Sequence, residues 1–169
     1  MLSLALSGGF AKGMSEYSVT VSWNRNSPEF LKGKYSREHT WSFDGGASIP
    51  ASSSPNVVPL PYSNPKCVDP EEAFVASISS CHMLTWLFLA SRAGFDVESY
   101  LDRAIGVMTK GENGQSWVSS VILNPVIEFT GEKRPTAEEL DRLHHLAHQQ
   151  CFIANSVKTT ITVSPGPRR

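Results

Sequence analysis

The sequence has almost no net charge, few cysteines and none of the short motifs that mark common metal sites. Its 15 basic and 16 acidic residues nearly cancel, and no block of like charge runs along the chain. We therefore expect neither a nucleic acid nor a membrane surface as a partner. Three cysteines in 169 residues are too few for the disulfide framework of a small secreted protein. Neither a C-x₂-C nor an H-E-x-x-H pattern is present, and we expect no metal or other cofactor.

A long uninterrupted apolar run is also missing. Residues 73–90 are the most apolar stretch, but they contain Ser77, Ser79, Ser80, His82 and Thr85. That composition suits a buried core helix better than a bilayer span. Residues 1–11 are mildly apolar, yet they lack a basic n-region and are interrupted by two glycines, which indicates a frayed terminus rather than a signal peptide. We therefore expect a soluble, cytoplasmic protein.

The length fits a single domain with a sizeable core, although an intertwined dimer is also compatible with it. We place the folded part at residues 16–164, with tails at residues 1–15 and 165–169. Alternating apolar side chains predict strands over residues 16–23 and 38–43. Residues 48–66 contain five prolines and many serines, which predicts an extended loop.

A long helix is predicted to begin at Asp69. This residue is a good N-cap, Pro70 follows at the first helical position, and Glu72 completes a capping box. Gly94 is predicted to end the helix as the residue after its C-cap. Because apolar side chains fall on nearly every face, we expect the helix to be covered on several sides.

The second half of the chain predicts a hairpin, a helix and a strand. The hairpin joins strands over residues 97–110 and 116–129 through a turn at residues 111–114, with a bend at Pro125. Thr136 and Glu139 form the capping box of a helix whose apolar stripe is Leu140, Leu143, Ala147 and Cys151. Alternation over residues 157–163 predicts a last strand. This order of elements favours an α+β fold over a doubly wound sheet.

Two cysteines, Cys81 and Cys151, lie seventy positions apart (151 minus 81), each inside a predicted helix. A single helix-borne cysteine is often only a small apolar core residue. Here both have polar or ionisable neighbours, namely Ser80, His82, His148, Asn155 and Ser156. If the two thiols meet in space, they can cycle between dithiol and disulfide.

The predicted helix by itself cannot activate Cys81. The residue lies about eleven positions past Pro70, roughly 16 Å along the axis and beyond the reach of the helix dipole, so a reactive thiolate requires a cation from elsewhere. Glu71 lies about ten residues before Cys81, roughly 15 Å away and turned about 80° around the axis. The two side chains cannot meet within one helix. If they share a site, a second copy of the helix supplies one of them, which indicates an antiparallel dimer.

Two motifs follow one another along the chain: Asp-Pro-Glu-Glu at residues 69–72 with Ser-Cys at residues 80–81, and Cys-Phe-Ile-Ala-Asn-Ser at residues 151–156. In order and spacing they resemble the OsmC/Ohr family of organic hydroperoxide reductases. The resemblance implies an intertwined homodimer in which antiparallel sheets surround two long central helices, with two active sites at the subunit interface. It also implies a thiol peroxidase that reduces organic hydroperoxides and is reduced by an external thiol or dithiol.

The resemblance implies four site residues: Cys81 as the peroxidatic cysteine, Cys151 as the resolving cysteine, Glu71 as the active-site glutamate and Arg37 as the arginine, with Arg25 as the alternative. His82 and the long loop at residues 48–66 depart from the family pattern. Cys67 has no counterpart, and its position in a loop indicates an incidental thiol. The aromatic and aliphatic residues Phe74, Met83 and Trp86 either line the substrate site or are plain core residues.

Two other functions compete with the peroxidase. His144 and His148 lie on one helix face, and together with His145, Cys151, Cys81 and His82 they could bind zinc. Histidines clustered on a helix are, however, more often solvated or capping residues. The third hypothesis is a catalytically silent binding module on the same fold, whose thiols do not cycle.

Overall fold

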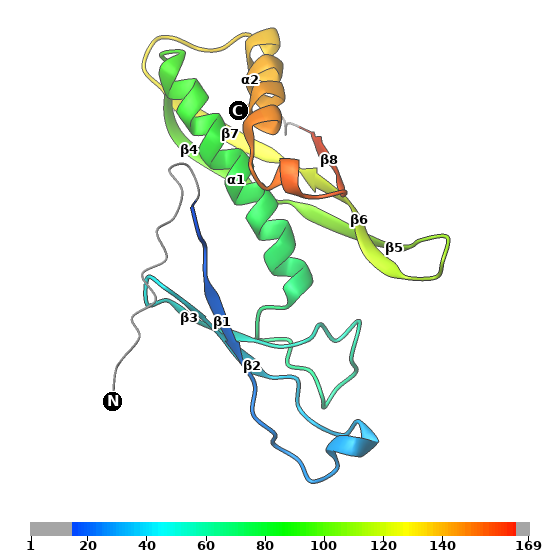
Figure 1. Cartoon of the computed structure of the whole chain (residues 1–169). Helices are drawn as coiled ribbons and strands as arrows, with labels where there is room; N and C mark the ends of the chain where they lie inside the picture. Colours follow the sequence, from blue (N-terminus) through cyan, green and yellow to red (C-terminus); the bar gives the residue numbers. More distant parts are fainter. Residues whose placement is uncertain (1–14, 165–169) are drawn as a thin grey trace, which may run out of the picture. The chain divides into compact units, whose positions relative to one another are not determined.

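The computed structural model describes residues 15–164 of the chain (Figure 1). The expected tails at residues 1–15 and 165–169 fall, apart from residue 15, outside the described residues. The chain divides into two compact units, Met1–Cys67 and Val68–Arg169, and each is described by itself.

The first unit is built on a three-stranded antiparallel sheet. Its strands β1 (Val19–Ser22), β2 (His39–Phe43) and β3 (Ser48–Ala51) are in the order β1-β2-β3, and a short 3₁₀ helix, η1 (Phe30–Lys32), lies between the first two. Strand β3 corrects the sequence prediction, because a continuous loop was expected over residues 48–66. Pro50 is compatible with a strand here because β3 is at the edge of the sheet, where one side of the strand has no partner.

The second unit begins with helix α1 (Pro70–Arg92), which confirms the predicted start and end. The Asp69 side chain accepts from the backbone N–H of Glu72, and the Glu72 side chain completes the capping box. Gly94 follows the C-cap with φ of 75°, a left-handed conformation that glycine adopts without strain. Because these signals lie within a few residues of each helix end, local sequence was sufficient to predict both.

Helix α1 packs against α2 and strands β4, β5 and β6, but not on every side. Its fully covered side chains are spaced by one turn: Ile78, His82, Trp86 and Ala90. Leu84 and Phe88 remain 61% and 59% exposed. By length and mean hydropathy (1.6) α1 is the one helix within residues 15–164 that could cross a membrane.

The predicted hairpin is correct at its turn, but each of its long strands divides in two. The four strands are β4 (Asp96–Asp102), β5 (Ile105–Lys110), β6 (Ser116–Leu123) and β7 (Pro125–Thr130). Strand β5 pairs with β6, whereas β4 pairs with β7 in a separate sheet. The division is held by the Asp102 carboxylate, which accepts from the backbone N–H of Asn124 at 2.6 Å, next to Pro125, where the bend was predicted.

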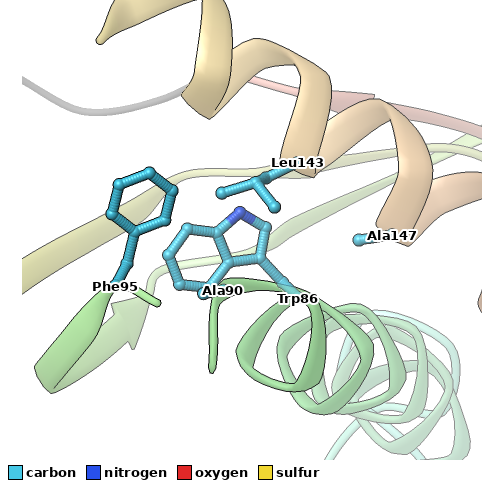
Figure 2. Close-up of a cluster of buried hydrophobic side chains, with 5 residues drawn as sticks. All are labelled: Trp86, Ala90, Phe95, Leu143 and Ala147. Atoms are coloured by element: carbon cyan, nitrogen blue, oxygen red, sulfur yellow. The ribbon is translucent and has the colours of Figure 1, made fainter. Parts of the chain in front are cut away.

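Helix α2 (Ala137–Gln150) has the predicted capping box of Thr136 and Glu139, and 3₁₀ helix η2 (Ala154–Ser156) and strand β8 (Thr160–Val163) follow it. Strand β8 joins β6 in parallel, so the sheet of β5, β6 and β8 is mixed. One core cluster consists of Trp86, Ala90, Phe95, Leu143 and Ala147, and Figure 2 shows the Trp86 indole between Phe95 and Leu143. A second cluster contains Ile78, Val121 and Leu123. The fold is α+β, as expected from the order of elements.

Candidate functional site: a pair of thiols between two helices

The sulfur atoms of Cys81 and Cys151 lie 2.7 Å apart, with the Cys151 S–H donating to the Cys81 sulfur. Both cysteines are free thiols in the second unit; Cys81 is half-buried and Cys151 is 1% exposed. A disulfide bond is about 2.05 Å long, so very little movement separates this contact from a covalent bond. The structure thus brings together the two thiols that the sequence singled out.

The sequence predicted that Cys151 lies inside a helix. In the structure it is instead the C-cap residue directly after α2. Its backbone N–H donates to the Ala147 carbonyl at 2.9 Å. The Asn155 side-chain amide donates to the carbonyls of Gln149 and Cys151, at 2.9 and 3.0 Å, and so satisfies the end of the helix. The backbone N–H of Ala154 contacts the Cys151 sulfur at 3.3 Å. The Cys-x-x-x-Asn-Ser motif is therefore a short loop that holds the thiol in place.

The environment of Cys151 keeps this thiol protonated. Burial and the hydrogen bond to Cys81 raise the pKa of Cys151 to about 11. At neutral pH the group is therefore a donor and not a competing thiolate.

Glu71 lies in the first turn of α1, away from Cys81 in the same helix. It helps to line a groove of about 400 Å³, whose walls are Pro70, Glu71, Phe74, Trp117, Val118, Val157, Lys158 and Thr159. Burial raises the pKa of Glu71, and the neighbouring Asp69 carboxylate adds to the shift. Because α1 is continuous, Glu71 and Cys81 are separated by about ten residues, roughly 15 Å of helix rise. Within this chain the structure does not bring them together.

Arg37 and Arg25, the two candidate arginines, both belong to the first unit. Arg37 donates to the carbonyls of Gly33 and Tyr35, and its guanidinium carbon lies 3.8 Å from the centre of the Tyr35 ring. Arg25 donates to the carbonyls of Ser27 and Pro28. Neither forms an ion pair among residues 15–164. Which of them accompanies Cys81 stays a prediction.

Sequence reasoning missed His39, which holds the backbone at Arg37. The Trp41 indole N–H donates to His39 Nε2 at 2.9 Å, and because an indole only donates, the His39 proton is on Nδ1. That Nδ1 lies 2.7 Å from the Arg37 carbonyl, to which it therefore donates. Alternation along β2 places His39 and Trp41 on one face of the strand. That alternation predicted the strand but not the hydrogen bond from His39 to the Arg37 carbonyl.

The histidines do not form the zinc site considered above. His82 and His144 are buried against each other, whereas His145 is exposed and bonded to Gln149. In the part of the chain that the structure describes, no three His, Cys, Asp or Glu side chains are grouped to hold a metal ion. Cys67 is half-buried in the first unit and is not part of the thiol pair. Among the apolar candidates, Trp86 is a core residue.

Fold and thiol pair together define a class: an α+β protein with two free cysteines, one in α1 and one at the C-cap of α2, whose sulfur atoms are in contact. A family model described as OsmC-like protein matches residues 63–165. The solved structure of an OsmC-like protein of unknown function from Vibrio cholerae is 50% identical, with a TM-score of 0.87, and the match covers 90% of this chain and 99% of that one. The chain therefore belongs to the OsmC-like protein family.

Two organic hydroperoxide resistance proteins share the fold. The protein from Elizabethkingia anophelis has 20% identity, a TM-score of 0.67 and coverage of 94% of this chain and 99% of that one. OhrB of Bacillus subtilis has 16% identity, a TM-score of 0.60 and coverage of 90% and 97%. At these identities the likeness concerns the fold alone. No curated protein matched the chain.

Proposed function

We propose that this protein is a cysteine-based peroxidase that reduces organic hydroperoxides to alcohols. The contact of 2.7 Å between the sulfurs of Cys81 and Cys151 carries the proposal, because a fold alone does not imply an activity. Membership of a family whose structural relatives include organic hydroperoxide resistance proteins supports the substrate class. We further propose a cytoplasmic location, where reducing thiols are available.

The proposed cycle has three steps. The Cys81 thiolate attacks the O–O bond of the hydroperoxide, the alcohol leaves after taking a proton, and Cys81 becomes a sulfenic acid. The Cys151 thiol then condenses with that sulfenic acid, which forms the disulfide and releases water. Two thiol equivalents from an external thiol or dithiol reduce the disulfide and restore both cysteines. Cys151 is well suited to the second step because it is already in contact with Cys81.

Arg37 and Glu71 are proposed to complete the site. The guanidinium would stabilise the Cys81 thiolate and orient a peroxide oxygen, and the Glu71 carboxylate would hold the guanidinium by a charge-assisted pair. Glu71 cannot reach the Cys81 of its own helix. We therefore propose a homodimer in which an antiparallel copy of α1 supplies one of the two.

The uncovered face of α1 supports this dimer. Leu84 and Phe88 are more than half exposed in a helix whose opposite face is fully buried. Exposed apolar side chains at helical spacing mark a surface that a partner helix covers. A second copy of the chain fits best, since it would supply the missing Glu71.

The proposal is tested by titrating thiols before and after one equivalent of an organic hydroperoxide such as cumene hydroperoxide. We expect the loss of two thiols per chain. Cys81→Ser abolishes turnover, whereas Cys151→Ser completes one turnover and then stalls with an oxidised Cys81. Cys67→Ser is the matched control and should retain wild-type turnover, because Cys67 is not part of the thiol pair.

Two outcomes would contradict the peroxidase. Full multi-turnover activity in Cys81→Ser would mean that another group attacks the peroxide. Retention of all three thiols in the presence of hydroperoxide would instead favour the catalytically silent binding module.

A further inference from the structure

A buried pair of imidazoles, which the proposed cycle does not use, lies between α1 and α2. His82 is 1% exposed and His144 is 5% exposed. Nε2 of His82 lies 3.1 Å from Nδ1 of His144, and the two rings are stacked with 5.4 Å between their centres and 6° between their planes. Such a hydrogen bond requires one ring to donate and the other to accept, so the accepting ring is neutral. The geometry is that of a polar link inside an otherwise apolar helix–helix contact.

The imidazole pair and the thiol pair link the same two segments. His82 directly follows Cys81 in α1, and His144 precedes Cys151 by seven residues, about two turns of α2. His144 also stacks on Trp86, one turn further along α1, with ring centres 5.5 Å apart. The position of α2 against α1, and hence of its C-cap thiol, depends on this contact.

The surroundings keep the pair neutral near pH 7 but give it access to water. Burial lowers the pKa of both imidazoles to about 4. His144 and His148 lower the pKa of His82 further, whereas Asp102 at the end of β4 opposes that shift. Asp141 in α2 opposes the shift of the His144 pKa. A groove of about 270 Å³ between α2 and β8 is lined by Asp141, His144, His145, His148, Ile161 and Val163.

We propose that the His82–His144 hydrogen bond is a positioning element that holds the Cys151 sulfur against Cys81 and so favours their disulfide. This inference rests on the proposed Cys81–Cys151 redox couple. Uptake of one proton by the pair places a charge in the helix contact, and uptake of a second leaves neither ring with a nitrogen that can accept. The link is therefore broken in acid, and the thiol contact is weakened with it.

The test measures the equilibrium between the Cys81–Cys151 dithiol and disulfide in glutathione redox buffers, on the full chain with Cys67→Ser. One glutathione disulfide is reduced to two thiols for each protein disulfide formed, so no peroxide is needed. We expect His82→Leu to reduce the effective concentration of the two thiols about tenfold, because it leaves a buried imidazole unpaired. His82→Gln places an amide nitrogen or oxygen near the position of Nε2 and should recover most of the loss.

His145→Leu is the matched control, since His145 follows His144 in α2 but is exposed and is hydrogen-bonded to Gln149 instead of to the imidazole pair. It should leave the equilibrium unchanged. A folded His82→Leu protein with the wild-type equilibrium overturns the inference. If His82→Leu does not fold, the wild type is compared with His82→Gln/His144→Asn between pH 7 and about pH 4.

In that comparison we expect the wild type to lose disulfide below about pH 5 relative to the double variant, which has no imidazole pair to protonate. Parallel curves overturn the inference. Failure of the proposed function gives a different result: the wild type would then form no Cys81–Cys151 disulfide at any ratio of oxidised to reduced glutathione.

Discussion

Cys151 is held in place by the short loop that follows it as well as by the packing of α2 on α1. Its φ of −70° is still helical, whereas its ψ of 116° turns the following chain out of the helix. The Asn155 amide satisfies the carbonyls left free there and so secures this turn. The turn brings the Ala154 N–H to the Cys151 sulfur, which also contacts the sulfur of Cys81.

Asn155→Ala should therefore destabilise the protein and its thiol contact together. The change removes two hydrogen bonds at the end of α2, and we expect the free energy of unfolding of the reduced protein to fall by about 1 kcal/mol. Urea denaturation followed by circular dichroism measures this. Ser156→Ala is the matched control, because it removes a single exposed bond to the Phe152 carbonyl. Equal stabilities for the two variants would contradict the capping role.

Among the elements, α1 provides both the rigid support of Cys81 and the distance between Cys81 and Glu71. Its start is defined by the capping box, which prevents the first turn from fraying. The groove at Glu71 is lined partly by this first turn. The same cap therefore supports the stability of the helix and the shape of the groove.

Asp69→Ala removes the acceptor for the backbone N–H of Glu72. We expect a loss of about 1 kcal/mol in the free energy of unfolding. Thiol titration should still show a reactive pair, because Cys81 lies three turns into the helix. Thr136→Ala makes the equivalent change at the start of α2. A stability unchanged by either substitution would show that the caps contribute less than their geometry indicates.

For the molecule as a whole, the proposed active site needs residues from both units and from two copies of α1. The thiols and Glu71 come from the second unit and the arginines from the first, and the length of α1 separates Glu71 from its own Cys81. In the proposed dimer, Glu71 of one copy lies near Cys81 of the other. This arrangement requires a second copy to cover the exposed face of α1.

Substitutions on that face should separate the copies. Leu84→Asp with Phe88→Asp places charges in the expected contact, and we expect a monomer in sedimentation experiments together with loss of peroxidase activity. Leu31→Asp is the control, since Leu31 is 94% exposed in the first unit. A dimer that persists in the double variant would place the interface elsewhere.

The free energy of unfolding should also depend on pH. The pKa values of His82 and His144 are lowered to about 4 in the folded protein, whereas an unfolded chain takes up protons near pH 6.5. As the pH falls between these values, only the unfolded state gains protons, so the free energy of unfolding falls by a few kcal/mol. Denaturation at a series of pH values measures the slope, and His82→Gln with His144→Asn should flatten it. An equally steep slope in that variant would assign the effect to other groups.

Local signals in the sequence were enough to predict the helix caps, the end of α1 at Gly94, the turn at residues 111–114 and the identity of the two thiols. Each depends on interactions within a few residues, where side-chain and backbone chemistry act directly. The division of each long strand was not predictable in this way. It depends on a hydrogen bond between Asp102, the last residue of β4, and Asn124, which lies between β6 and β7.

The contacts that matter most for chemistry are the least local ones. The two thiols are 70 positions apart and the two imidazoles 62, and both contacts form only when α2 returns to pack on α1. The sequence identified the thiols as a possible pair, but it grouped His82 with His144 only as possible zinc ligands and not as partners in a hydrogen bond. Periodicity within a helix says which side chains share a face. Which residues another helix presents to that face follows from packing, and packing alone joined His82 to His144 and Cys81 to Cys151.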